Sequence, residues 1–212
     1  MFTIREYSKS NYKKAKFFDG SIGTHTVRFL SDDAFSGTSH FFNNVPVKCL
    51  GEPECPLCEN NFRLIKENPR DFRNMPGWSP QRQVFYVNLL DRTPVKKCKE
   101  CAKSVKSVSG TYPFICPGCG AQLANVEITQ ANEVVILNFG VELAGQLNTI
   151  MQANMDADKN PLSLTKYDLM ITIDKSKKKF PQALLANNDE IKASDYELFD
   201  LDKSIIALSH DE

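Results

Sequence analysis

The chain has 212 residues, and its 26 Lys and Arg residues balance 26 Asp and Glu residues, so the formal net charge is zero. This length fits one domain, or one domain with a small insertion, and can bury a core without disulfides. The sequence has no apolar run of about 18 residues, which argues against a membrane span, and no apolar signal core at its start. The zero net charge argues against a nucleic-acid partner only if the charge is evenly spread.

The charge is unevenly distributed along the chain. Residues 187–212 contain eight acids and two lysines, whereas residues 59–106 contain eleven basic and five acidic residues. Residues 1–20 form a further basic segment with interspersed aromatic residues. We therefore expect a basic N-terminal arm at 1–20, a core at 21–186 and an acidic C-terminal tail at 187–212. This asymmetry is typical of a polyanion-binding surface joined to a competing or recruiting tail; a solvated surface with a solubilising tail is the alternative.

The first elements surround a cluster of three cysteines. Alternation predicts a strand over 23–31 and a short strand over 45–48, and residues 59–68 fit a short helix that Pro69 ends. Between the last two lie Cys49, Cys55 and Cys58, and three thiolates require a fourth ligand to complete a tetrahedral zinc site. His40 lies nine residues before Cys49 and is the best candidate, although a polar histidine at a strand end would give the same pattern. The sequence thus predicts a zinc subdomain at about 38–75, with one histidine and three cysteine ligands.

A Pro/Gly-rich loop with Trp78 leads into the clearest strand, residues 82–90. Alternate residues of a strand share a face, which puts Tyr86 with Val84 and Asn88, and Phe85 on the opposite face. We expect Phe85 to lie in the core and Tyr86 to face a ligand. The alternative is that both rings are buried.

The second cysteine cluster consists of two C-x-x-C pairs separated by fourteen residues, Cys98/Cys101 and Cys116/Cys119. This spacing predicts a zinc ribbon with four cysteine ligands, inserted at about 94–123. Disulfides are disfavoured without a secretory signal, and a redox C-x-x-C does not require a second pair. Four protein ligands at each centre favour structural zinc, and the deaminase signature fails because no Glu follows His40 at the general acid/base position. Two structural Zn²⁺ ions are therefore expected.

The remaining elements follow the ribbon. We expect a strand at 133–139, an amphipathic helix at 141–151, a strand at 167–173 and a basic turn at 175–179. Together these predict a mainly β protein with minor α structure. An oligonucleotide-binding (OB) barrel carrying the two zinc units is the natural candidate.

Several of these features occur in the same order in one known family. The chain resembles the single-stranded-DNA-binding (helix-destabilising) proteins of T-even-type bacteriophages. The shared features are the basic arm, Val27-Arg28-Phe29-Leu30, the His40/Cys49/Cys55/Cys58 order, Phe85-Tyr86-Val87-Asn88-Leu89-Leu90, Asn138-Phe139-Gly140 before a helix, and the acidic tail. The second zinc ribbon is absent from the best-known members, and the arm lacks the family's compact basic motif.

The resemblance implies an OB-fold core and a protein that coats single-stranded DNA in phage replication, recombination and repair, in the bacterial host cytoplasm. It also implies self-association along DNA through the arm, and contacts of the tail with replication or recombination proteins. Binding of this kind combines phosphate neutralisation with base stacking. The candidate DNA-binding residues are Trp78, Arg82, Tyr86, Phe42, Arg63, Arg70, Arg73, Arg92, Lys96 and Lys97, and the candidate arm residues are Arg5, Lys13, Lys14 and Lys16.

Two other classes of function are alternatives to this interpretation. A zinc-ribbon transcription or replication factor would act through protein docking or duplex DNA. An enzyme is disfavoured because the sequence has no HExxH, P-loop, nucleophile elbow or dense carboxylate cluster. No membrane partner is expected.

Overall fold

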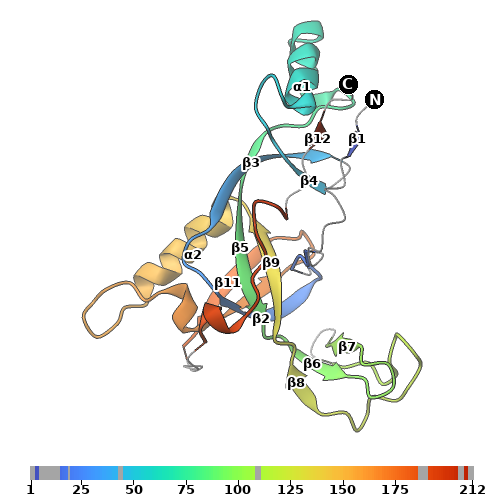
Figure 1. Cartoon of the computed structure of the whole chain (residues 1–212), viewed down its shortest axis with the longest axis vertical. Coiled ribbons are helices and arrows are strands. Elements are labelled where there is room, and N and C mark those ends of the chain that lie inside the picture. The colour runs from blue at the N-terminus through green and yellow to red at the C-terminus, as the bar shows by residue number, and fades with distance from the viewer. Residues whose placement is uncertain are drawn as a thin grey trace.

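The computed structural model describes residues 3–4, 15–18, 20–42, 45–107, 111–185, 191–204 and 208–209. Within them the protein is mainly β, with antiparallel sheets and two α-helices (Figure 1). None of the helices in these ranges is both long and apolar enough to cross a membrane.

Seven strands form the central sheet: β2 (Gly23–Phe29), β3 (Phe35–Phe42), β4 (Val45–Lys48), β5 (Arg82–Asp91), β9 (Glu133–Phe139), β10 (Asp168–Ile173) and β11 (Lys179–Leu184). Their order is β11-β10-β2-β5-β3-β4, and β9 pairs with the other edge of β5. Because Phe29 pairs with Leu89 and Phe35 pairs with Tyr86, β2 and β3 follow one another along a single edge of β5. β5 is thus the centre of the sheet.

A closed barrel is not shown. Among the described residues no backbone ladder joins β9 to β11. The two edges are linked instead by the Lys179 side chain, whose Nζ donates a 2.8 Å hydrogen bond to the carbonyl oxygen of Asn138. The fold class therefore stands as mainly antiparallel β with little helix.

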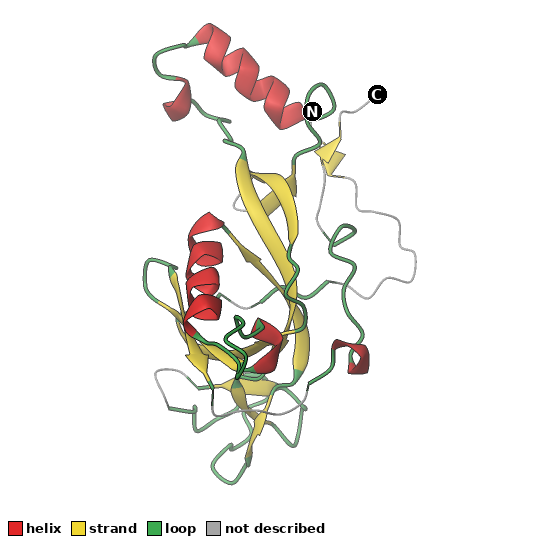
Figure 2. Ribbon diagram, turned by 90° about the vertical axis from the view of Figure 1, so that its left-hand side faces the viewer, coloured by secondary structure: helices red, strands yellow, loops and turns green. Residues whose placement is uncertain are grey.

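The main core lies on one face of this sheet, under helix α2 (Val141–Ala153). Leu143 and Leu147 of the helix are buried in the same cluster as Val87 and Leu89 of β5. Phe85 packs against this cluster and stacks on Phe139 with ring centroids 5.5 Å apart. Figure 2 shows α2 lying along the sheet. Phe85 thus lies on the predicted core-facing side of β5, where it is partly buried.

The opposite face of β5 and β9 is covered by the C-terminal segment. Phe199 and Leu201 pack against a buried cluster that includes Tyr86 and Ile136. The side chain of Asn88 donates to the Phe199 carbonyl oxygen at 3.0 Å and accepts from the Phe199 amide at 3.1 Å. Residues 191–204 therefore form part of the folded body, although composition alone marks them as a tail.

Two smaller units project from the ends of the sheet (Figure 1). At one end, helix α1 (Pro56–Glu67) and the 3-10 turn η1 (Phe72–Asn74) follow β4. At the other end, β6 (Pro94–Lys97), β7 (Ser104–Lys106) and β8 (Ile128–Gln130) form a three-stranded sheet in the order β7-β6-β8. The ribbon therefore extends beyond residue 123, to Gln130.

The other short elements are β1 (Thr3–Ile4), which pairs with β12 (Leu208–Ser209), and the 3-10 turns η2 (Leu164–Lys166) and η3 (Ala193–Asp195).

A buried ion cluster joins the ribbon to the sheet. Asp168 Oδ1 on β10 accepts hydrogen bonds from Arg28 Nε on β2 at 2.8 Å and from Arg92 Nη1 at 3.0 Å. Asp168 and Arg28 have fully buried side chains. Arg92 also donates through Nε and Nη2 to Gln130 Oε1 on β8, at 3.2 and 3.1 Å. Asp168 thus holds Arg92 at the start of the ribbon, and Arg92 in turn holds Gln130 at its end.

Candidate metal centres

The first candidate centre consists of His40, Cys49, Cys55 and Cys58, whose ligand atoms all lie within 4.8 Å of one another. His40 comes from β3, Cys49 follows β4, and Cys55 and Cys58 occupy the start of α1. Cys55 is the N-cap of α1 and Pro56 its first residue, so the positive end of the helix dipole faces the thiolates. The predicted fourth ligand, His40, is brought to the three cysteines.

Hydrogen bonds fix the orientation of His40. Its Nδ1 lies 2.6 Å from the carbonyl oxygen of Ser79. Because a carbonyl oxygen only accepts, Nδ1 carries the proton, and Nε2 is left with a lone pair toward the cysteines, 3.3 Å from Cys58 Sγ. Such outer hydrogen bonds set the tautomer of metal-binding histidines.

Two further polar side chains support this centre. Asn61 donates to the Ser79 carbonyl oxygen at 2.6 Å and accepts from the Ser79 amide at 3.0 Å, which fixes the Ser79 peptide groups. Gln81 Nε2 donates to Cys58 Sγ at 3.0 Å and to Cys49 Sγ at 3.3 Å. N–H donors stabilise negative charge on thiolate sulfur. Asn61, Ser79 and Gln81 were not predicted from the sequence; the only available signal was a polar residue about one helical turn after Cys58.

The second candidate centre consists of Cys98, Cys101, Cys116 and Cys119. Cys98 and Cys116 are buried, whereas Cys101 and Cys119 are exposed. Each C-x-x-C pair forms a tight turn, which we call a knuckle. The two knuckles have the same backbone pattern, because Ala102 N donates to Cys98 O and Gly120 N donates to Cys116 O, both at 2.9 Å. The residue after each pair has a positive φ, 58° at Ala102 and 79° at Gly120. A hydrogen bond from the Gly118 amide helps lower the pKa of the Cys116 thiol to about 7.

Both donor sets fit a tetrahedral metal ion. At a Zn–S distance of about 2.3 Å, tetrahedral geometry separates two sulfurs by about 3.8 Å. The Sγ–Sγ distances in the structure are 3.4 Å for Cys49/Cys58, 3.6 Å for Cys98/Cys119 and 3.7 Å for Cys101/Cys116. All exceed a disulfide bond of about 2.05 Å, and the cysteines are free thiols. The two groups can therefore hold two metal ions.

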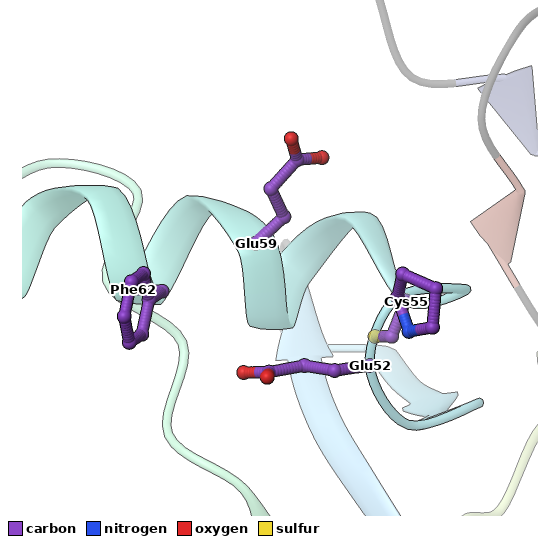
Figure 3. A pocket seen from close by; sticks show the side chains of 5 residues that line it. Glu52, Cys55, Glu59 and Phe62 are labelled. Carbon is purple, nitrogen blue, oxygen red and sulfur yellow. The ribbon is translucent and has the colours of Figure 1, made fainter.

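A hollow of about 460 Å³ adjoins the first centre. Glu52, Pro53, Cys55, Glu59 and Phe62 line it. Figure 3 shows Glu52 extending beside α1 toward Phe62. With two carboxylates at its rim, this hollow does not suit a polyanion.

Aromatic rings with arginine partners lie on the segments that supply and support the first centre. Arg82 lies over the exposed ring of Phe41, with Cζ 5.4 Å from the centroid. Trp78 is half-buried and packs edge-on against Phe72 at 4.7 Å, and Arg73 lies over the same Phe72 ring. Cation–π pairs of this kind present flat surfaces that combine positive charge with apolar area. We call Phe41, Arg82, Phe72, Arg73 and Trp78 the aromatic platform.

Three of the predicted DNA-binding side chains are engaged inside the protein. Tyr86 is only 1% exposed, and its hydroxyl lies 3.1 Å from Ser39 Oγ, so the prediction that it faces a ligand is wrong. Alternation placed Tyr86 on the correct face, but the tail covers that face. Arg92 is buried in the ion cluster with Asp168 and is not a surface phosphate ligand. Lys96 is half-buried, and its Nζ donates to the Leu123 carbonyl oxygen at 2.8 Å.

The other candidates are exposed or lie outside the description. Arg70, Arg73, Arg82 and Lys97 are exposed, and Arg63 is exposed but forms an ion pair with Glu67 at 2.8 Å. Lys16 is exposed and pairs with Glu133. The side chain of Phe42, together with Arg5, Lys13 and Lys14, lies outside the described residues.

Searches of protein-family models and of curated protein sequences gave no match to this chain. Its function is therefore inferred from the two centres and the surfaces around them.

Proposed function

We propose that this protein binds single-stranded DNA without sequence preference and that two structural zinc ions maintain its binding surface. Four protein ligands complete a tetrahedral shell at each centre and leave no position for a catalytic water, so both ions are structural. The protein acts as a binding module rather than as an enzyme. The roles in phage DNA replication, recombination and repair, and self-association through the arm, belong to the same proposal.

The observation that carries this proposal is the direct connection from the first metal centre to the aromatic platform. His40 donates to the carbonyl oxygen of Ser79, and Ser79 is the neighbour of Trp78 in the chain. The Ser79 hydroxyl donates to the carbonyl oxygen of Phe41 at 2.9 Å. A metal ion on His40 therefore restrains both the Trp78 loop and the Phe41 strand. Rigid aromatic faces stack on bases of any sequence, at roughly 1–3 kcal/mol per base.

The charge around the platform matches a nucleic-acid backbone. Arg73 and Arg82 are part of the platform itself, and Arg70 is exposed on the same loop as Arg73. Guanidinium groups pair with phosphate and also stack on rings, which suits a strand whose phosphates and bases alternate. Neutralised phosphates release counterions, so binding weakens as salt rises.

The order of the elements supports an OB-type core. Strands β2 and β3 together, β5 and β9 form a three-stranded meander, and α2 follows. Strand β10 then pairs back to β2, and β11 pairs with β10. We propose that this is an OB barrel in which the Lys179–Asn138 hydrogen bond stands at the β9–β11 closure. OB folds bind ligands on the second and third strands, which correspond here to β5 and β9.

The tail lies on that same surface. Phe199 and Leu201 cover Tyr86, and Asp202 forms a 2.6 Å ion pair with Lys48 on β4. The Asp202 carboxylate thus binds a lysine that could otherwise contact a phosphate. We propose that the tail competes with DNA for the outer face of β5, and that replication or recombination proteins that bind the tail relieve this competition.

The decisive experiment is a titration with oligo-dT and with duplex DNA at several salt concentrations. Trp78 is the single tryptophan of the sequence, so its emission reports on the platform. We expect quenching by oligo-dT, an affinity for oligo-dT that exceeds that for duplex by orders of magnitude, and a negative slope of log affinity against log salt. Equal affinity for duplex would favour the transcription-factor alternative, and no binding to either would refute the proposal.

A further inference from the structure

The ribbon carries a second surface that is both basic and apolar. Residues 94–131 contain five lysines and two glutamates. Lys97, Lys99 and Lys103 are exposed around the first knuckle. Phe114 and Ile115, immediately before the second knuckle, are 63% and 54% exposed. Exposed apolar side chains beside lysines distinguish this surface from an ordinary solvated one.

The lysines and the apolar side chains meet at the second knuckle. A Cβ atom built on Gly118 would lie 2.9 Å from Lys103 Cδ, so the Lys103 stem crosses the second knuckle. Phe114 and Ile115 are held at the entrance to that knuckle, because Leu123 N donates to Phe114 O at 2.9 Å and Ile115 pairs with Gln122. Lys96 Nζ lies 5.4 Å from the ring centroid of Tyr112, nearby in the chain. The ribbon thus combines positive charge with exposed aromatic area.

The ribbon surface has a fixed position relative to the platform. The Arg92 amide donates to the Thr26 carbonyl oxygen at 2.8 Å, and the Arg92 side chain joins Asp168 on the sheet to Gln130 on the ribbon. β5 starts at Arg82, beside Phe41, and ends at Asp91, where the ribbon begins. A strand of this length spans about 30 Å. Figure 1 shows the ribbon at the end of the sheet opposite α1.

We propose that the ribbon is a second contact region for the same single strand, with Phe114 stacking on a base and Lys97, Lys99 and Lys103 contacting phosphates. This inference rests on the proposed function and extends it to the ribbon. One polymeric anion can contact the platform and the ribbon together, because they lie at opposite ends of one strand. Linking two contact regions raises affinity only when the ligand spans both.

The test compares oligo-dT of about 8 nucleotides, which fits one contact region, with oligo-dT of about 30 nucleotides, which spans both. The variants are Phe114→Ala and the triple variant Lys97→Gln/Lys99→Gln/Lys103→Gln. The matched control is Lys159→Gln/Lys166→Gln/Lys175→Gln, which removes the same charge from exposed positions on other loops and turns. Each variant is first checked for full zinc content and an unchanged melting temperature.

Both ribbon variants should bind the long oligonucleotide about tenfold more weakly than the unaltered protein and the short one equally well. The triple variant should also show a shallower salt dependence, by about one unit of slope per lysine. The control should match the unaltered protein. If the ribbon variants bind the long oligonucleotide normally while the unaltered protein prefers single strands, the ribbon is not a DNA contact, and a protein-docking role replaces this inference. Equal losses on both lengths would also contradict it, and failure of the unaltered protein to bind any single strand would refute the proposed function itself.

Discussion

At the scale of single residues, the carbonyl oxygen of Ser79 accepts hydrogen bonds from both His40 Nδ1 and Asn61 Nδ2, each at 2.6 Å. Replacing Asn61 with Ala removes one of these bonds and leaves the buried Ser79 amide without its Asn61 acceptor. We expect the free energy of unfolding to fall by about 1–3 kcal/mol and zinc affinity at the first centre to fall about tenfold. Urea denaturation and competition with a zinc chelator measure the two effects.

The matched control for this substitution is Asn74→Ala. Asn74 is exposed, and its side chain bonds Asp71 on the same turn. We expect a change within about 0.5 kcal/mol, as for most surface substitutions. If Asn61→Ala behaved like the control, Ser79 would not depend on Asn61 for its position.

Ala102 and Gly120 occupy equivalent positions in the two ribbon knuckles, both with left-handed backbone. An L-residue pays roughly 1–2 kcal/mol for this conformation, whereas glycine adopts it freely. Glycine is more flexible in the unfolded chain, and the entropic cost of ordering it offsets part of this gain. Ala102→Gly should therefore stabilise the zinc-loaded ribbon by about 0.5–1 kcal/mol. Gly120→Ala should destabilise it by a similar amount, although no atom lies within 4 Å of the new methyl group. Thermal melts of the zinc-loaded variants with opposite signs would support this; shifts in the same direction would refute it.

At the scale of the elements, the two metal centres differ in exposure. The ribbon has two exposed cysteines, whereas Cys55 and Cys58 at the start of α1 are buried. A chelator should therefore remove the ribbon ion first. Release of the ribbon ion should leave Trp78 emission unchanged. Release of the ion at the His40 centre should change it, because among the described residues that centre connects to Trp78 through Ser79. Melting temperature and DNA affinity should fall together when both ions are removed.

Stopped-flow mixing with a chromogenic chelator follows zinc release and tryptophan emission in the same sample. If Trp78 emission changed when the ribbon ion was released, the proposed connection between Trp78 and the His40 centre would be contradicted. An unchanged thermal melt after complete metal removal would show that the ions do not stabilise the fold.

The ion cluster of Arg28, Asp168 and Arg92 connects β2, β10 and the start of the ribbon. Replacing Asp168 with Asn removes the negative charge between two buried guanidinium groups. Because the substitution weakens two buried charge-assisted hydrogen bonds at once, we expect a loss of about 3–5 kcal/mol in the free energy of unfolding. Asp158→Asn, in an exposed loop, is the control and should change stability little. Equal urea midpoints for the two variants would be incompatible with a structural role for the cluster.

At the scale of the whole molecule, the tail and the sheet form one folded unit. The double substitution Phe199→Ser/Leu201→Ser keeps every charge but removes the apolar contacts with Tyr86 and Ile136. If the tail competes with DNA, this variant should bind oligo-dT about tenfold more tightly, a gain of about 1.4 kcal/mol. Its Tyr86 should also become reactive toward nitration. If Tyr86 became exposed and the affinity for oligo-dT did not change, the tail would not compete with DNA.

Features set by nearby residues were accessible from the sequence. Both ligand groups follow from cysteine spacing, and the strand at 133–139 was predicted with its observed bounds because its apolar run is continuous. The environments of Tyr86 and Arg92 depend in part on residues far away in the chain, Leu201 of the tail for Tyr86 and Asp168 for Arg92. The acid-rich composition of the tail predicts a solvated segment. Its few apolar residues contact the sheet, and the sequence alone does not show that contact. Strand β11 was missed because its sequence lacks a clear alternation of apolar and polar residues and contains Pro181.

The pairing of β5 with β9 ends at Asp91 and Glu133, which are direct cross-strand neighbours. The whole ribbon therefore occupies the place of a hairpin loop, and a two-residue turn could join the same two strands without changing their register. Gain or loss of the second metal centre in evolution would then leave the strand order intact. Loss of the insertion would also remove side chains that it supplies to the sheet, because Arg92 pairs with Asp168 and Lys106 pairs with Asp91.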